Sequence, residues 1–388
     1  MRNRNEAPFD VAVIGGGVIG LAVAWRARQR GFTVTVLERG ELGGGTSRVA
    51  AGMLAPIAEA DPSEAALLEL GLASLRSYPS FIEQLTRASG CEPGYLRCGT
   101  LLVARDRDEA ESLSRELEMR TSLGLPVQRL RASEARGLEP GLAPTVRLAL
   151  LVADDHAIDP RTLTAALGGA LARAGGELRT GAEVRELELS DGGEDAHRVV
   201  LAGGERISAR RVVIAAGVWS AEIEGIPDHC RVPVRPVKGQ IMRLRDLAGP
   251  ALLTRVIRMA AGYIVPRGDG RYVLGATMEE RGFDTTVTAG AVFELLRDAI
   301  ELVPGFSELV IEELSAGLRP GTPDNCPVIG ESEISGLYWA TGHHRNGILL
   351  APITAELLVG ELAGEQPSEL AAGFAPGRFA HAAAESAP

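Results

Sequence analysis

Three glycines near the start of the chain, and one acidic residue beyond them, have the spacing of a dinucleotide-binding motif. Gly15, Gly17 and Gly20 follow the β-branched run at residues 11–14, and Glu38 lies 18 residues after Gly20. The first glycine permits a tight turn, the second lets a pyrophosphate approach the backbone, and the third lets a helix lie close to the strand. A carboxylate at that distance accepts hydrogen bonds from ribose hydroxyls, which disfavours a 2′-phosphate. The pattern predicts an adenine dinucleotide and leaves NAD and FAD open.

The segment that follows Glu38 favours the flavin dinucleotide. It reads GGGTSRVAAGMLAP at residues 43–56, with hydroxyls at Thr46 and Ser47 and several small residues after them. A nicotinamide-dependent dehydrogenase would continue its alternation of strand and helix at this point. A loop of small residues with hydroxyl donors suits a second phosphate and a wide, flat ring instead. A flexible glycine loop without a ligand is the alternative.

A second unusual stretch, TGHHRNGILLAP at residues 341–352, lies near the end of the chain. His343, His344 and Arg345 stand between two glycines, and an apolar run follows at once. Such a helix entrance would direct backbone N–H groups and the positive end of a helix dipole at negative charge. For the two histidines a structural role is favoured over proton transfer. Metal binding by the adjacent pair His343 and His344 is not expected.

The elements that must position these residues alternate between strand and helix. Residues 11–37 read as a β-α-β unit, and helices are predicted at 62–90, 107–124 and 290–303. Residues 159–181 read as a helix that starts at Asp159-Pro160, followed by a turn and a strand. Short alternating segments between residues 233 and 315 predict an antiparallel sheet. We therefore expect an α/β fold of two interleaved domains. The dinucleotide domain is assigned to residues 1–85, 150–225 and 316–375, the substrate domain to 86–149 and 226–315, and a frayed tail to 376–388.

Composition excludes several classes of partner. The chain has 388 residues and a net charge of −11, which argues against non-specific binding to nucleic acid or to an anionic membrane. The uncharged run at residues 11–25 is shorter than the ~20 residues that span a bilayer, and the start of the chain does not read as a signal peptide. The four cysteines form no CxxC pair, so we expect no metal site and a cytoplasmic protein.

Eight separated motifs together resemble the FAD-dependent D-amino acid oxidase superfamily. They are VIGGGVIGLAVAW, TSRVAAGMLAP, VVIAAGVWS, PVKGQ, YIVPR, VLGATM, GLRPGTPD and GHHRNGILLAP, and the last four favour the glycine oxidase branch associated with thiamine thiazole synthesis. The resemblance implies a Rossmann-type FAD-binding domain interleaved with a substrate domain built on an antiparallel sheet. It also implies FAD held without a covalent bond, because Gly317 stands where a related branch carries a flavin-linking cysteine.

The resemblance extends the cofactor contacts beyond the glycine motif and gives the entrance at residues 341–352 a role toward the negative charge of a reduced flavin ring. The full set of cofactor contacts predicted for this chain is Gly15, Gly17, Val18, Ile19, Gly20, Glu38, Arg39, Thr46, Ser47, Ala51, Gly52, Met53, Val184, Gly217, His343, His344, Arg345, Asn346, Gly347, Ile348 and Leu349.

The substrate residues are also implied by the resemblance. Arg319 would bind the carboxylate of an amino acid through its planar fork, and Tyr263 would present its hydroxyl to the same carboxylate. Met278 would line the pocket near the substrate α-carbon, and Arg345 would add a cation near the ring or the carboxylate. Ala261 stands where some members of the branch carry a polar residue, which leaves the substrate range open.

The reaction implied is oxidative deamination of glycine, with sarcosine or small D-amino acids as further substrates. Hydride passes from the α-carbon to flavin N5, an imine forms, and O₂ reoxidises the flavin to give H₂O₂. The alternatives are an amine or D-amino acid dehydrogenase with a non-oxygen acceptor, a flavin-binding module without catalysis, and, least favoured, an NAD-dependent dehydrogenase. The expected partners are further copies of the chain, in a homo-oligomer, and a thiazole synthase that receives the imine.

Overall fold

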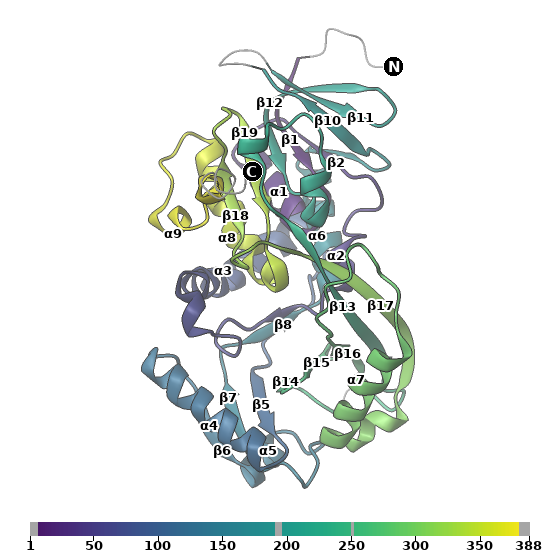
Figure 1. Ribbon diagram of the computed structural model, residues 1–388. Helices are drawn as coiled ribbons and strands as arrows, with labels where there is room; N and C mark the ends of the chain where they lie inside the picture. The colour runs from purple at the N-terminus through teal and green to yellow at the C-terminus, as the bar shows by residue number, and fades with distance from the viewer. Residues whose placement is uncertain (1–6, 191–195, 250–251, 380–388) are drawn as a thin grey trace.

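The structure is a computed structural model that describes residues 7–190, 196–249 and 252–379 (Figure 1). Two eight-stranded sheets occupy opposite halves of the molecule, and a small three-stranded sheet lies between them (Figure 1). The small sheet consists of β3 (Met53–Leu54), β8 (His156–Ile158) and β4 (Tyr95–Leu96).

The first large sheet begins with the predicted β-α-β unit. Its path runs β10-β11-β12-β1-β2-β9, with β19 paired to β12 and β18 to β19. The strands are β1 (Phe9–Ile14), β2 (Val34–Leu37), β9 (Glu177–Arg179), β10 (Val184–Glu188), β11 (His197–Leu201), β12 (Arg206–Ile214), β18 (Val328–Glu331) and β19 (Leu337–Thr341). β1 is parallel to both β2 and β12, so the carboxyl ends of these strands meet at one edge.

Helices pack against this sheet and against one another. They are α1 (Val18–Gln29), α3 (Ala65–Ser89), α6 (Pro160–Arg173) and α8 (Gly347–Leu362), followed by the short α9 (Glu369–Ala372). The Trp25 ring of α1 meets Phe81 of α3 edge to face at 5.5 Å. α6 begins at the predicted Asp159-Pro160 pair, where the Asp159 side chain accepts a hydrogen bond from the Arg161 amide. Both faces of α1 and of α8 are largely buried, as their apolar sequences require.

The second large sheet has the strand order β17-β13-β16-β15-β14-β5-β7-β6. Its strands are β5 (Thr100–Ala104), β6 (Gln128–Arg131), β7 (Leu148–Val152), β13 (Arg235–Arg245), β14 (Val256–Met259), β15 (Gly262–Pro266), β16 (Arg271–Gly275) and β17 (Val310–Gly321). The pairing is antiparallel except between β14 and β5. α4 (Arg107–Ser122), α5 (Ala132–Leu138) and α7 (Ala289–Leu302) accompany this half (Figure 1).

Short helices and turns complete the described chain. They are α2 (Thr46–Val49) and the 3₁₀ turns η1 (Pro62–Glu64), η2 (Gly217–Glu222), η3 (Asp228–Cys230), η4 (Pro304–Glu308), η5 (His344–Asn346) and η6 (Pro376–Phe379). Among the described helices, none has the length and apolar character needed to cross a membrane.

The predicted fold class, an α/β dinucleotide unit interleaved with a largely antiparallel second sheet, is confirmed. The domain boundaries proposed from the sequence differ from the sheets at two places. The boundary at 149/150 falls inside β7, and the boundary at 315/316 falls inside β17, because each strand pairs along its whole length. Residues 376–379, assigned to a frayed tail, form η6, where Arg378 donates a 2.8 Å hydrogen bond to Asp324. Residues 380–388 lie outside the described part of the chain.

Candidate active site

A cavity of about 600 Å³ lies where the carboxyl ends of β1 and β2 meet the second sheet. Its wall includes Ile14 and Leu37, the last residues of β1 and β2, and also Ile241 of β13 and Tyr263 of β15. Ligands of open α/β sheets bind outside the carboxyl ends of the parallel strands. The cavity is therefore the candidate site for both cofactor and substrate.

The cavity brings together the residues predicted from distant parts of the sequence. Those that line it are Gly15, Gly17, Val18, Ile19, Glu38, Arg39, Thr46, Ser47, Ala51, Gly52, Met53, Val184, Gly217, Tyr263, Met278, Arg319, His343, His344, Arg345, Asn346, Gly347, Ile348 and Leu349. Gly20 does not line the cavity, because its Cβ position faces Val13 of β1 and the Gly15 carbonyl oxygen. The roles assigned to these residues remain predictions.

Two glycines of the motif, Gly15 and Gly20, lie where the turn leaves no room for a side chain. Gly15 has φ +108°, and a Cβ atom there would lie 2.5 Å from the Ala215 carbonyl oxygen. A Cβ atom on Gly20 would lie 2.0 Å from the Gly15 carbonyl oxygen, which explains why α1 can approach β1 so closely. Gly17 is the N-cap of α1 and offers no side-chain cap, so the helix terminus can accept an anion.

Glu38 closes the turn from the end of β2. Its two carboxylate oxygens accept hydrogen bonds from the Gly16 amide at 2.7 Å and the Gly40 amide at 2.8 Å. Each carboxylate oxygen has a further lone pair, so the group can also accept hydrogen bonds from ribose hydroxyls. The predicted ribose contact is compatible with this arrangement.

The loop after β2 connects the two halves of the cavity. The Thr46 hydroxyl donates to the Leu318 carbonyl of β17 at 2.5 Å, and the Ser47 hydroxyl accepts from the Val18 amide at 3.0 Å. Gly52 has φ +79°, and a Cβ atom there would lie 1.9 Å from the Ile158 carbonyl oxygen. The small residues thus let this loop run directly along the cavity, as the flavin interpretation of the sequence requires.

Trp219 of η2 lies at the cavity wall between a cation and a second ring. The Arg39 guanidinium carbon is 3.8 Å from the centre of the Trp219 ring, and the ring of Phe283 is 4.5 Å away on a tilted plane. Arg39 was predicted as a cofactor contact, and its stacking on Trp219 fixes its orientation at the cavity.

Arg319 and Tyr263 approach each other at the second sheet. Nη1 of Arg319 donates to the Thr277 carbonyl at 3.2 Å, and among the described residues no carboxylate forms an ion pair with this guanidinium. Burial raises the pKa of the Tyr263 hydroxyl, although the positive charge of Arg319 acts in the opposite direction. A protonated phenol and an uncompensated guanidinium on one wall are the groups that bind a carboxylate.

Arg345 differs from Arg319 because two carboxylates already pair with it. Its guanidinium lies 3.0 Å from Glu64 and 3.6 Å from Glu59, both from the segment that leads into α3. The sequence predicted that Arg345 adds a fixed cation near the ring or the substrate carboxylate. The side chain lines the cavity, but most of its charge is offset by these two acidic groups.

The two histidines of the helix entrance are neutral. Burial lowers the pKa of His343 to about 3, and its Nε2 lies 3.0 Å from the Thr354 hydroxyl of α8. Burial, and then the positive charges of Arg319 and Arg345, lower the pKa of His344 to about 4. His344 has φ +45°, and its buried Nε2 has no hydrogen-bond partner among the described residues. His343 therefore has a structural partner, whereas His344 does not.

Met278 lies at the mouth of the cavity. Its side chain is 63% exposed, so it lies at the rim of the cavity. The resemblance implied that Met278 lines the pocket near the substrate α-carbon; it does line the cavity, and its place beside the α-carbon stays a prediction. The exposure arises because residues 276–284 leave β16 as a loop over the surface.

Comparison with known proteins agrees with the geometry. The family described as FAD dependent oxidoreductase matches residues 10–360. The chain belongs to this family. Its cofactor is FAD, and the cavity suits this group. Glycines at the N-terminus of α1 leave space for phosphate, and the Glu38 carboxylate at the end of β2 can bind ribose. The loop of small residues after β2 leaves space for the ring.

Two relatives and one solved structure illustrate the similarity. The chain is 37% identical to a glycine oxidase of Geobacillus kaustophilus over 356 residues, covering 91% of this chain and 92% of that protein. It is also 37% identical to the bifunctional protein ThiO/ThiG of a Synechocystis species, of which it spans only 54% of the length. The crystal structure of the Geobacillus kaustophilus glycine oxidase superposes with a TM-score of 0.88 at 35% identity, covering 95% of this chain and 98% of that one.

Several cavity residues were not predicted from the sequence. Gly239 of β13 leaves space for the Arg319 guanidinium, and the Thr277 carbonyl accepts a hydrogen bond from it. Glu59 lies beside Arg345 and offsets part of its charge. A glycine in the middle of an eleven-residue strand is a signal for a close approach, and it could have identified Gly239. No local pattern marks Glu59, because its partner lies almost 300 residues further along the chain.

Proposed function

We propose that this protein is an FAD-dependent oxidase of glycine that forms an imine and H₂O₂, with O₂ as the electron acceptor. The observation that carries the proposal is the guanidinium of Arg319, which has no acidic partner among the described residues, beside the Tyr263 hydroxyl in a cavity suited to FAD. Relatives that match this chain over almost their full length are glycine oxidases. The FAD-dependent dehydrogenase with another acceptor is the second candidate, and no observation favours it.

When bound, FAD supplies the redox chemistry by accepting two electrons from the substrate and passing them to O₂. The protein binds and orients the amino acid. Arg319 takes the carboxylate through two parallel N–H donors, and the Tyr263 hydroxyl donates a further hydrogen bond to it. The carboxylate is fixed by two side chains, so the α-carbon and amine have one orientation toward the rest of the cavity.

The surroundings of Arg319 strengthen its attraction for a carboxylate. An apolar cluster that includes Ala51, Ile241, Val265 and Val273 packs behind Tyr263. Charge-assisted hydrogen bonds in such a water-poor site contribute roughly 1.5–3 kcal/mol each. His344 is neutral, and its Nε2 has no hydrogen-bond partner among the described residues. We therefore propose that this nitrogen accepts a hydrogen bond from a group bound in the cavity.

Three further assignments go with this proposal. Hand-off of the imine to a thiazole synthase is supported by the bifunctional ThiO/ThiG relatives, in which a segment similar to this chain makes up about half of the protein. A homo-oligomer is supported by the exposed apolar side chains of Val310, Ile311 and Leu314 on β17, which is an edge strand. A cytoplasmic location is supported by four unpaired cysteines.

A panel of amines tests the substrate class. Oxygen consumption should be saturable with glycine, weaker with sarcosine and D-alanine, and absent with methylamine, which has no carboxylate for Arg319. If methylamine were oxidised as efficiently as glycine, binding of the substrate carboxylate by Arg319 would be excluded from the mechanism. Oxidation of D-alanine faster than glycine would keep the mechanism and reassign the substrate.

A further inference from the structure

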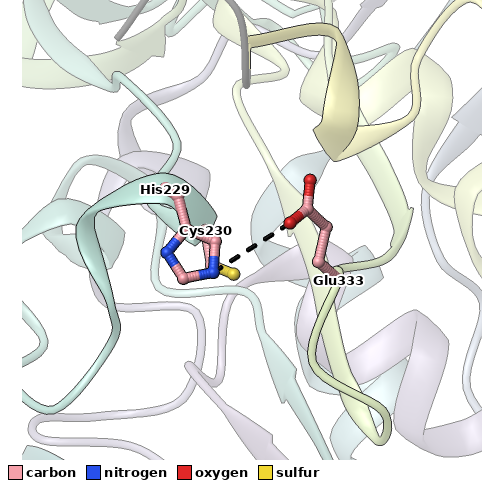
Figure 2. Close-up of side chains that lie close together, drawn as sticks. All are labelled: His229, Cys230 and Glu333. Atoms are coloured by element: carbon pink, nitrogen blue, oxygen red, sulfur yellow. Dashed lines mark ion pairs between the residues drawn. The ribbon is translucent and has the colours of Figure 1, made fainter. Parts of the chain in front are cut away.

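A group of potential metal ligands lies outside the cavity. It consists of His229, Cys230 and Glu333, whose imidazole nitrogen, Sγ and carboxylate oxygen all lie within 4.8 Å of one another. Figure 2 shows the three side chains converging, with the His229–Glu333 ion pair drawn as a dashed line. None of the three lines the cavity, so the cluster has no part in the proposed oxidation.

The two chain segments that carry the ligands are fixed by their own hydrogen bonds. Cys230 ends η3, where its amide donates to the Pro227 carbonyl at 2.9 Å, in the connection between β12 and β13. Glu333 lies in the turn between β18 and β19, which is closed by a 2.8 Å bond from the Ser332 amide to the Leu337 carbonyl. The positions of the three Cα atoms are therefore set by the fold.

The ligand atoms are placed to close on an ion with small movements. Nε2 of His229 lies 4.0 Å from Oε2 of Glu333, and both side chains are about 60% exposed. Bonds of about 2.0–2.3 Å to zinc put tetrahedral ligand atoms roughly 3.5 Å apart. The exposed pair can approach the ion while Cys230, which is 6% exposed, stays in its packed position.

The donor set selects the class of ion. A thiolate, an imidazole and a carboxylate are ligands of zinc, whereas magnesium and calcium prefer oxygen atoms alone. From this geometry we propose that His229, Cys230 and Glu333 bind a zinc-class divalent ion, with water in the fourth position. The ion displaces the proton of the Cys230 thiol on binding.

Such an ion would cross-link two segments near the cofactor cavity. Arg231 follows Cys230 directly, and its Nη1 donates to the Ala221 carbonyl at 3.1 Å and the Ile223 carbonyl at 3.3 Å. Ile223 lines the cavity. Binding of the ion at Cys230 and Glu333 stabilises the folded chain by linkage, so it should raise the melting temperature of the holoenzyme.

The proposal is tested with the tag-free holoenzyme, stripped of metal with a chelator and then equilibrated with zinc chloride. We expect one tightly held zinc per chain after gel filtration, a higher melting temperature, and, with cobalt chloride in place of zinc, absorption bands to the red of the flavin bands. Glu333→Gln and His229→Gln change exposed side chains and should fold normally, yet each should weaken zinc binding at least tenfold. Cys230→Ser should abolish it.

Cys91→Ser is the matched control, because Cys91 is an exposed thiol outside the cluster. It should bind zinc as the unsubstituted protein does. Equal zinc affinity in the unsubstituted protein, Glu333→Gln and His229→Gln would overturn the proposal and identify the bound zinc as adventitious. Failure of the unsubstituted protein to retain zinc would overturn it as well. Neither result depends on whether glycine is the substrate.

Discussion

A Cβ atom on Gly239 would lie 2.4 Å from Nη2 and 2.5 Å from Nη1 of Arg319. The two residues lie on β13 and β17, whose pairing is antiparallel, with Val237 opposite Arg319. The guanidinium thus lies directly over the backbone of Gly239, in space that a side chain would fill. The position of the proposed carboxylate ligand depends on this glycine.

Gly239→Ala should therefore displace Arg319 without changing its charge. Since a flexible side chain is the obstacle, the protein should fold and keep its FAD. Loss of one charge-assisted hydrogen bond should raise the KM for glycine roughly 10- to 100-fold. Gly290→Ala, at a glycine with open space around its Cβ position, is the control and should leave steady-state kinetics unchanged. An unchanged KM in Gly239→Ala would show that Arg319 does not need this position.

Arg319→Ala removes the guanidinium that we propose binds the substrate carboxylate. Two charge-assisted hydrogen bonds of about 1.5–3 kcal/mol each correspond to a loss of roughly 10²–10⁴ in kcat/KM for glycine. The yellow colour and the flavin spectrum should persist, because the glycine turn and Glu38 lie at the other sheet. Tyr263→Phe should cost roughly 10- to 100-fold, as expected for one hydrogen bond to a charged carboxylate. Steady-state oxygen uptake measures both, and unchanged kinetics in Arg319→Ala would exclude the arginine as carboxylate ligand.

Gly20→Ala tests the turn that holds the dinucleotide. Its Cβ atom would meet the Gly15 carbonyl oxygen at 2.0 Å, and neither backbone can move without separating α1 from β1. We expect a loss of about 1–3 kcal/mol or more in the free energy of unfolding, together with loss of FAD during purification. Gly169→Ala in α6 has nothing near its Cβ position and should be neutral or slightly stabilising. Full FAD content and unchanged unfolding in Gly20→Ala would contradict the close packing of this turn.

The buried histidines predict the acid sensitivity of the fold. The pKa of His343 is about 3 and that of His344 about 4 in the folded chain, against 6.5 when exposed. Below pH 6.5 the unfolded chain therefore binds protons that the folded chain does not, so this stability is complete above pH 6.5 and is lost as the pH falls toward 4. Each histidine contributes up to about 1.4 kcal/mol for each pH unit in that window.

His343→Gln should reduce this dependence while keeping a side chain that can hydrogen-bond Thr354. Melting temperatures measured from pH 7 to pH 5 should fall less steeply in this variant than in the unsubstituted protein. His229→Gln provides the comparison when all three proteins are measured with a chelator present, because His229 is exposed. Identical pH profiles for all three proteins would show that His343 does not resist protonation in the folded state.

Local patterns in the sequence were sufficient for the dinucleotide half of the site. The run of β-branched residues, the spacing of Gly15, Gly17 and Gly20 and the acid at the end of β2 lie within thirty residues, and each has a direct stereochemical cause. For the same reason helices such as α4 and α7 were predicted close to their observed bounds. Short-range periodicity is what a single sequence expresses most clearly.

The features that were missed join distant segments. The pairing of Arg345 with Glu59 and Glu64 and the cluster of His229, Cys230 and Glu333 depend on how separate strands and turns come together. The extents of β7 and β17 were also missed, because pairing with a neighbouring strand sets where each one ends. Exposure of Met278 at the cavity mouth depends on the path of a loop, which residue type alone does not determine.

The most direct test of glycine oxidation is to mix the holoenzyme with glycine without oxygen, record the flavin spectrum, and then admit air. We predict that the visible flavin bands bleach with glycine and return when oxygen enters, and that one H₂O₂ forms for each glycine oxidised. Flavin bands that do not change with glycine would contradict the proposed substrate. Bands that bleach with glycine but do not recover in air would contradict the oxidase and point to a dehydrogenase with another acceptor.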